Sequence, residues 1–137
     1  MKKRLTFIGI LLLIISFTSC EKKEEEKKQE INKEELVQAH VWKGVEVKTF
    51  VNGSETNSIS ISDYEFTFDA NKDFEITKNG NVEFSGTWEY VKGDPDILKL
   101  TKTSGVEEYN IDKITEDNFE FSIETLTGEE YKYFLEK

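Results

Sequence analysis

The stretch VEFSGTWEY, residues 82–90, decides the fold class of this chain, because apolar and polar residues alternate along it. Its even-numbered positions hold an aliphatic residue, a glycine and three aromatic residues, whereas its odd-numbered positions hold only Glu, Ser and Thr. This period of two is typical of a strand with one buried face. The same alternation recurs in residues 64–68 and 119–124, and no ten-residue helical pattern appears from Trp42 onward. The sequence therefore predicts an all-β domain.

Short turns separate the alternating runs. Glycine, asparagine and aspartate favour turns, and they cluster at 52–53, 69–73, 79–80, 93–96, 104–105, 115–118 and 127–128. The predicted strands are 42–51, 57–68, 73–78, 81–91, 96–102, 106–112, 118–125 and 129–135, and the second is long enough to bend near Ser62-Asp63. Links this short permit only antiparallel neighbours. The sequence therefore predicts an eight-stranded antiparallel meander closed into a β-barrel, because closure removes exposed edges; an open or sandwiched sheet is the alternative.

The residues before the strands have the organisation of an export signal. A basic start at 1–4 precedes an apolar run of 13 residues at 5–17, and small residues follow. This run is shorter than the ~20 residues that span a bilayer, and it fits a signal peptide. We predict that residues 1–19 are this signal peptide.

The end of the signal resembles the lipobox of bacterial lipoproteins, in which a cysteine is acylated and becomes the new N-terminus. The segment reads Phe17-Thr18-Ser19-Cys20, with Phe17 and Ser19 departing from the usual Leu-(Ala/Ser)-(Gly/Ala)-Cys pattern. The resemblance implies that lipidated Cys20 attaches the protein to the bacterial outer membrane, on its periplasmic or its cell-surface face. The alternative is an ordinary secretory signal with a chance cysteine.

The chain is strongly acidic. Its net charge is −10, and loss of the three basic residues Lys2, Lys3 and Arg4 with the signal peptide makes it −13. Such a charge excludes electrostatic binding to nucleic acid or to an anionic membrane surface. Residues 20–35 are predicted to be a charged, flexible tether, because 21–30 contains no apolar residue. A short helix is expected at 31–39, where the chain enters the domain at 36–137.

The domain resembles the small bacterial lipocalin-like lipoproteins. Residues 36–47 are similar to their opening helical turn and first-strand Trp, residues 66–74 to their hairpin, and Gly86-Thr87-Trp88 to their Gly-Thr-Trp strand. The resemblance implies a lipocalin-like β-barrel with a short N-terminal helical turn. His40-Val41-Trp42 stands where large lipocalins have Gly-x-Trp, and no arginine lies near the last strand. Ligand properties of the large lipocalins are therefore not carried over.

Aromatic residues on the inner face are the candidate ligand-binding residues. They are Phe66, Phe84, Trp88, Tyr90, Tyr109, Phe121 and Tyr133. An apolar wall with a few hydroxyls suits a small apolar or amphipathic ligand in the barrel mouth. Alternatively, the rings fill the barrel, since eight strands enclose little more than their own side chains. Short strands and large rings favour a mostly filled interior, in which case loops would bind a protein partner.

No motif points to catalysis or to a cofactor. His40 is the only histidine, no Gly-x-Ser-x-Gly segment is present, and His40 is expected as a polar residue at the start of the first strand. Residues 69–73 have Asp-x-Asn-x-Asp spacing, but Phe74 and Gly80 stand where a calcium loop needs Gly and Glu. This segment is predicted to be a hairpin turn. We therefore expect a binding protein without catalytic residues, metal or cofactor.

Overall fold

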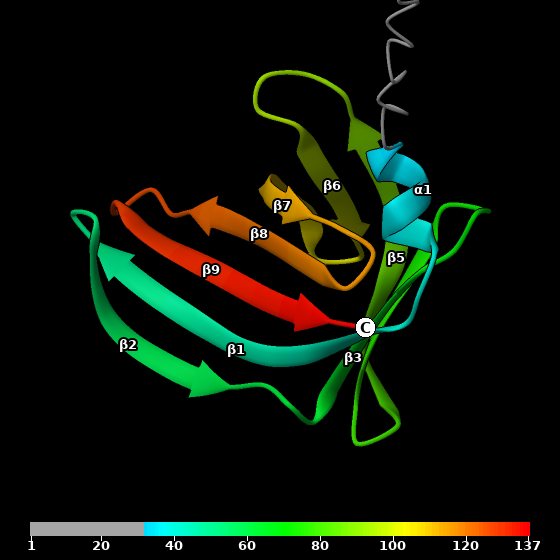
Figure 1. Ribbon diagram of the computed structural model, residues 1–137, viewed down its shortest axis with the longest axis horizontal. Helices are drawn as coiled ribbons and strands as arrows, with labels where there is room; N and C mark the ends of the chain where they lie inside the picture. The colour runs from blue at the N-terminus through cyan, green and yellow to red at the C-terminus, as the bar shows by residue number, and fades with distance from the viewer. Residues whose placement is uncertain (1–31) are drawn as a thin grey trace, which may run out of the picture.

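The computed structural model describes residues 32–137, which form one short helix and nine strand segments (Figure 1). These are α1 (Lys33–Gln38), β1 (Trp42–Val51), β2 (Ser54–Ser60), β3 (Tyr64–Phe68), β4 (Asp73–Lys78), β5 (Asn81–Val91), β6 (Ile97–Lys102), β7 (Gly105–Ile114), β8 (Asn118–Glu124) and β9 (Glu129–Glu136). The predicted signal peptide and Cys20 lie outside the described residues. Within residues 32–137, no helix is long and apolar enough to cross a membrane.

The strands form one antiparallel sheet that closes on itself. From β3 to β9 each strand pairs with the next, and β1 pairs with β9 from Lys43↔Glu136 to Val51↔Glu129. This last pairing closes the barrel, so the antiparallel, lipocalin-like barrel predicted from the sequence is confirmed. The short connections explain why consecutive strands pair antiparallel, whereas closure adds the pairing of β1 with β9.

The predicted second strand is interrupted, and this explains why nine segments make an eight-stranded barrel. Both β2 and β3 pair with β1, one along each half of it. Between them the Ile61 N–H still donates to the Val45 carbonyl (3.1 Å), and Tyr64 N–H donates to the Ile61 carbonyl (2.9 Å). A Cβ on Gly44 would lie 2.2 Å from the Ile61 carbonyl oxygen. Only a glycine therefore lets the interrupted strand approach β1 so closely.

Helix α1 lies at one end of the barrel, from which β1, β2 and β9 extend away (Figure 1). Asn32 caps the helix, accepting hydrogen bonds from the Glu34 and Glu35 N–H groups. Ion pairs join Lys33 to Asp96 and Glu34 to Lys72, so the helix is attached to two turns of the barrel. The helix begins at Lys33, and its first turn lies within the segment 20–35 that the sequence assigned to the tether.

The barrel is filled at the end that α1 covers, which we call the closed end. Its buried residues are Val37, Trp42, Phe68, Phe74, Trp88, Leu98, Phe119 and Leu135. The Trp42 indole N–H donates to the Val37 carbonyl (3.1 Å), and the Trp88 indole N–H donates to the Asp69 carbonyl (3.0 Å). Both polar atoms of these large rings are therefore satisfied, so the rings are buried without loss of hydrogen bonding.

Candidate functional site

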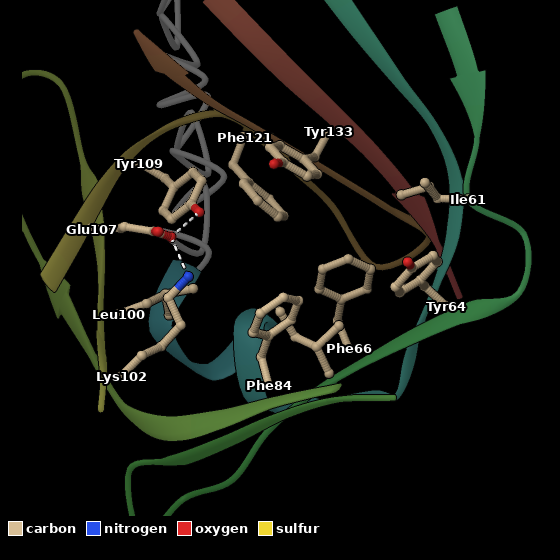
Figure 2. A pocket seen from close by; sticks show the side chains of 11 residues that line it. Ile61, Tyr64, Phe66, Phe84, Leu100, Lys102, Glu107, Tyr109, Phe121 and Tyr133 are labelled. Atoms are coloured by element: carbon tan, nitrogen blue, oxygen red, sulfur yellow. Dashed lines mark hydrogen bonds and ion pairs between the residues drawn. The ribbon is translucent and has the colours of Figure 1, made fainter. Parts of the chain in front are cut away.

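The opposite end of the barrel, which we call the open end, contains a cavity of about 290 Å³ (Figure 2). It is lined by Ile61, Tyr64, Phe66, Ile76, Phe84, Leu100, Lys102, Glu107, Tyr109, Phe121 and Tyr133. The inner face of β5 shows the change from one end to the other. Phe84 is 49% exposed although it faces inward, whereas Trp88 on the same face is 2% exposed. The cavity is therefore a partly filled barrel interior that is open to solvent.

The floor of the cavity is a packed group of aromatic rings around Phe121. The Tyr133 ring stacks on Phe121 with centroids 5.0 Å apart, and the Tyr109 ring meets Phe121 edge-on at 5.3 Å. The Phe66 ring also meets Phe121 edge-on, with centroids 6.2 Å apart. Offset-stacked and edge-to-face contacts of this kind are favourable for aromatic pairs. The apolar floor is therefore preformed by contacts within the barrel.

A polar cluster lies on one wall of the cavity, facing Ile61 and Tyr64 on the other side (Figure 2). The Lys102 ammonium donates to Glu107 Oε2 at 2.6 Å, and the Tyr109 hydroxyl donates to the same oxygen. The Lys102 ammonium also lies 5.1 Å from the centroid of the Phe84 ring. A hydrogen-bonded ion pair is thus placed inside an otherwise aromatic pocket.

The fold favours the charged form of Glu107 in this ion pair. Burial alone would raise the pKa of Glu107, but the hydrogen bonds from Lys102 and Tyr109 together outweigh it and lower the pKa below its ordinary value of 4.5. Burial raises the pKa of the Tyr109 hydroxyl, and its hydrogen bond to the Glu107 carboxylate raises it further. Burial also raises the pKa of Tyr133. The carboxylate of Glu107 and the neutral phenols of Tyr109 and Tyr133 are therefore the forms that the cavity favours.

Five of the seven candidate residues line this cavity: Phe66, Phe84, Tyr109, Phe121 and Tyr133. Trp88 and Tyr90 do not. Trp88 is buried in the closed end, with its ring 5.8 Å from Phe68 and below the Lys72 ammonium. Tyr90 lies near Asp96, and burial together with the Asp96 carboxylate raises its pKa to about 12. The expectation of a mostly filled interior thus describes the closed end, and the expectation of a pocket describes the open end.

Lys102 and Glu107 are not among the site residues predicted from the sequence, although strand alternation contains the signal for both. Lys102 is two residues beyond Leu100 and faces inward with it, and Glu107 is two residues before Tyr109. Charged residues on strands normally face solvent, so neither residue type suggests an inward position. A lysine and a glutamate that fall on the apolar face of two paired strands, β6 and β7, are the exception that marks the site.

The other candidate motifs have structural roles. Residues 69–73 form the predicted hairpin turn between β3 and β4, in which the Asp69 N–H donates to the Asp73 carbonyl at 2.8 Å. His40 lies just before β1, with its ring edge-on to Trp42 at 5.6 Å. Within residues 32–137, no group of three or more His, Cys, Asp or Glu side chains is placed to hold a metal ion.

Comparisons with protein families and with curated proteins give no match for this chain. No protein-family model matches its sequence, and no curated protein is significantly similar to it. The lipocalin-like assignment therefore rests on the closed barrel itself, and the functional argument rests on the open-end cavity.

Proposed function

We propose that this protein is a lipid-anchored binding protein of the bacterial cell envelope, which holds a small apolar or amphipathic ligand in the mouth of its barrel. The observation that carries the proposal is the open-end cavity, with its aromatic floor and its single ion pair. Small-molecule sites are typically concave and mostly apolar, with a few polar groups that orient the ligand. Binding rather than catalysis is the function that this combination supports.

The anchor follows from the sequence at Cys20. The mature charge of −13 opposes binding to an anionic membrane surface, so an attached lipid would have to supply the affinity. Each buried methylene contributes ~0.8 kcal/mol, and more than one acyl chain makes the attachment stable. The segment after Cys20 would then separate the barrel from the outer membrane.

Labelling with a fatty acid tests the anchor. Wild-type protein in the producing cell should incorporate labelled palmitate and stay in the membrane fraction after a buffer wash. The Cys20→Ser variant should incorporate none and should remain uncleaved or become soluble. Wild-type protein that carries no label and washes off would contradict the proposed anchor without bearing on the cavity.

Ligand binding is tested with the mature chain from residue 20 carrying Cys20→Ser, which keeps every described residue. The uncharged fluorophore N-phenyl-1-naphthylamine should bind saturably with increased, blue-shifted emission, because it leaves water for an apolar site. Phe84→Ala should weaken this binding. Val91→Ala is the matched control, because Val91 lies on the outer face of the same strand and is 41% exposed. Absence of saturable binding, or equal loss in both variants, would argue against the cavity as a ligand site.

A second candidate function, binding of a protein partner, is supported by β2. Within the described residues β2 pairs only with β1, all seven of its residues are exposed, and Glu55 is its only charged residue. A free edge with a single charged residue can accept an extended segment of another protein as an additional strand. A photo-crosslinking residue at Asn57 should then trap one defined partner in intact cells, whereas one at Glu89, on the interior strand β5, should trap none.

A further inference from the structure

The charges of the open-end cavity cancel each other. Among the described residues that line it, only Lys102 and Glu107 are charged, and they face one another at 2.6 Å. The Lys102 side chain is only 15% exposed, so its charge is largely removed from water. The cavity therefore offers a ligand a polar wall with no net charge, in a chain that is otherwise strongly acidic.

Hydrogen-bonding capacity remains on this wall after the ion pair has formed. Lys102 and Tyr109 both donate to Oε2 of Glu107, which leaves Oε1 without a donor among the described residues. An ammonium has three N–H donors, and one of those on Lys102 is used by Glu107. The Tyr133 hydroxyl at the edge of the floor makes no hydrogen bond with a described residue. A ligand hydroxyl or amide can therefore both donate and accept here.

A charged ligand head would disrupt this arrangement. A carboxylate would either lie beside Glu107 or take Lys102 away from it, and the second case leaves a half-buried carboxylate unpaired. An alkylammonium would either lie beside Lys102 or take Glu107 away from it, and the second case leaves the Lys102 ammonium unpaired. Separating a partly buried ion pair is costly because the abandoned charge has lost part of its water. An uncharged head avoids both conflicts, while the aromatic floor takes up an apolar chain or ring in every case.

We propose that the open-end cavity selects uncharged amphiphiles, whose hydroxyl or amide head binds beside the Lys102–Glu107 pair, and discriminates against fatty-acid carboxylates and alkylammonium ions. This inference rests on the proposed function, because it presupposes that the cavity binds a ligand. It assigns Lys102 and Glu107 as the residues that determine ligand class.

Three ligands with the same alkyl chain test the inference: decanol, decanoate and decylammonium. Each competes with N-phenyl-1-naphthylamine on the mature Cys20→Ser chain at about pH 7.5, where the acid and the amine are both ionised. Decanol should displace the fluorophore at a concentration at least about tenfold lower than either ion. Decanol is also the most apolar of the three, so variants must show that the protein causes the difference.

Breaking the ion pair on either side should change the selectivity in opposite directions. Glu107→Gln leaves Lys102 unpaired, so the affinity for decanoate relative to decanol should rise at least about tenfold. Lys102→Met leaves Glu107 unpaired and should raise the relative affinity for decylammonium instead. Lys113→Met and Glu120→Gln are the matched controls, because these residues form an ion pair at 3.3 Å on the outer surface. Neither control should alter the selectivity.

The outcomes separate this inference from the proposed function. Failure of the fluorophore and all three competitors to bind overturns both. Binding of the fluorophore with wild-type preference for decanoate or decylammonium overturns the inference alone, and so do relative affinities that Glu107→Gln and Lys102→Met leave unchanged. Far-UV circular dichroism verifies that each variant is folded. If one of the two variants is unfolded, the other, compared with its control, gives the deciding result.

Discussion

The two ends of the barrel are built by the same strands but differ in how they are filled. At the closed end, α1 covers Trp42, and the Trp42, Phe68 and Phe119 rings are at most 1% exposed. At the open end, the inward-facing Phe84 is 49% exposed and a cavity of about 290 Å³ remains. The closed end therefore provides stability and the open end provides space.

This difference shows how a domain of about 100 residues without a disulfide can keep a cavity. A small core stabilises a domain only marginally, so an unfilled volume must be offset by dense packing elsewhere. Here both tryptophans lie in the closed end, each with its indole N–H bonded to a backbone carbonyl. The aromatic floor around Phe121 separates the two regions.

Truncation of one large ring at each end should give the largest difference. Trp88→Ala creates a cavity in the closed end and should lower the free energy of unfolding by about 3–5 kcal/mol. Phe84→Ala removes a half-exposed ring and should cost only about 1 kcal/mol. Urea unfolding followed by circular dichroism measures both values. A Trp88→Ala variant that melts within a few degrees of wild type would show that the closed end is not the stabilising region.

A methyl group added between the two ends should give the next largest effect. A Cβ on Gly86 would lie 2.0 Å from the Thr101 carbonyl oxygen and 3.0 Å from the Phe74 ring. Gly86→Ala therefore forces the backbone of β5 and β6 apart and should cost about 1–3 kcal/mol in urea unfolding. Ser85→Ala, at the neighbouring exposed position on the outer face, should be nearly neutral. Equal stability of the two variants would be inconsistent with this close approach.

Removal of the helix cap should have a smaller effect on stability. It weakens α1, which covers the closed end of the barrel. Asn32→Ala leaves the Glu34 and Glu35 N–H groups without their acceptor and should cost about 1 kcal/mol. Asn57→Ala is the control, because the Asn57 side chain in exposed β2 makes no hydrogen bond with a described residue. Thermal melting of both variants measures the difference. An Asn32→Ala variant that melts at the same temperature as Asn57→Ala would mean that the cap of α1 does not stabilise the barrel.

The smallest expected effect is a change in the pH dependence of stability, which arises from tyrosines at the open end. The fold raises the pKa of Tyr109 and Tyr133 above the ordinary value of 10, so the unfolded chain loses these protons first. Stability should therefore be fully present below pH 10 and fall as the pH rises above it. Tyr109→Phe should cost about 1 kcal/mol at neutral pH and make the alkaline decline shallower. Melting temperatures across the alkaline range check this, and an unchanged slope would contradict it.

Local pattern was sufficient to predict most of the fold. The alternation in residues 82–90 and the turn residues between the runs predicted antiparallel strands in meander order, and β4 (Asp73–Lys78) and β5 (Asn81–Val91) have the predicted bounds. The bend expected near Ser62-Asp63 is the interruption between β2 and β3. The helix expected at 31–39 is found at Lys33–Gln38, where Asn32 provides an N-cap.

The candidate site was predictable only in part. Alternation shows which face of a strand a residue occupies, so Phe66, Phe84, Tyr109, Phe121 and Tyr133 were correctly placed inside the barrel. It does not show how far along the barrel axis a residue lies. Trp88 and Tyr90 share the inner face of β5 with Phe84 and yet belong to the closed end.

The sequence by itself determined that this chain is acidic, has an apolar run of 13 residues shortly before Cys20, and alternates as an antiparallel barrel does. The tertiary structure alone decided which end of that barrel is filled. The reason is physical: strand register and the docking of α1 determine which inward-facing rings meet, and both depend on residues far apart in the chain. By contrast, the local hairpin of β6 and β7 brings Lys102 to Glu107, but only the closed barrel makes their shared face the wall of a cavity.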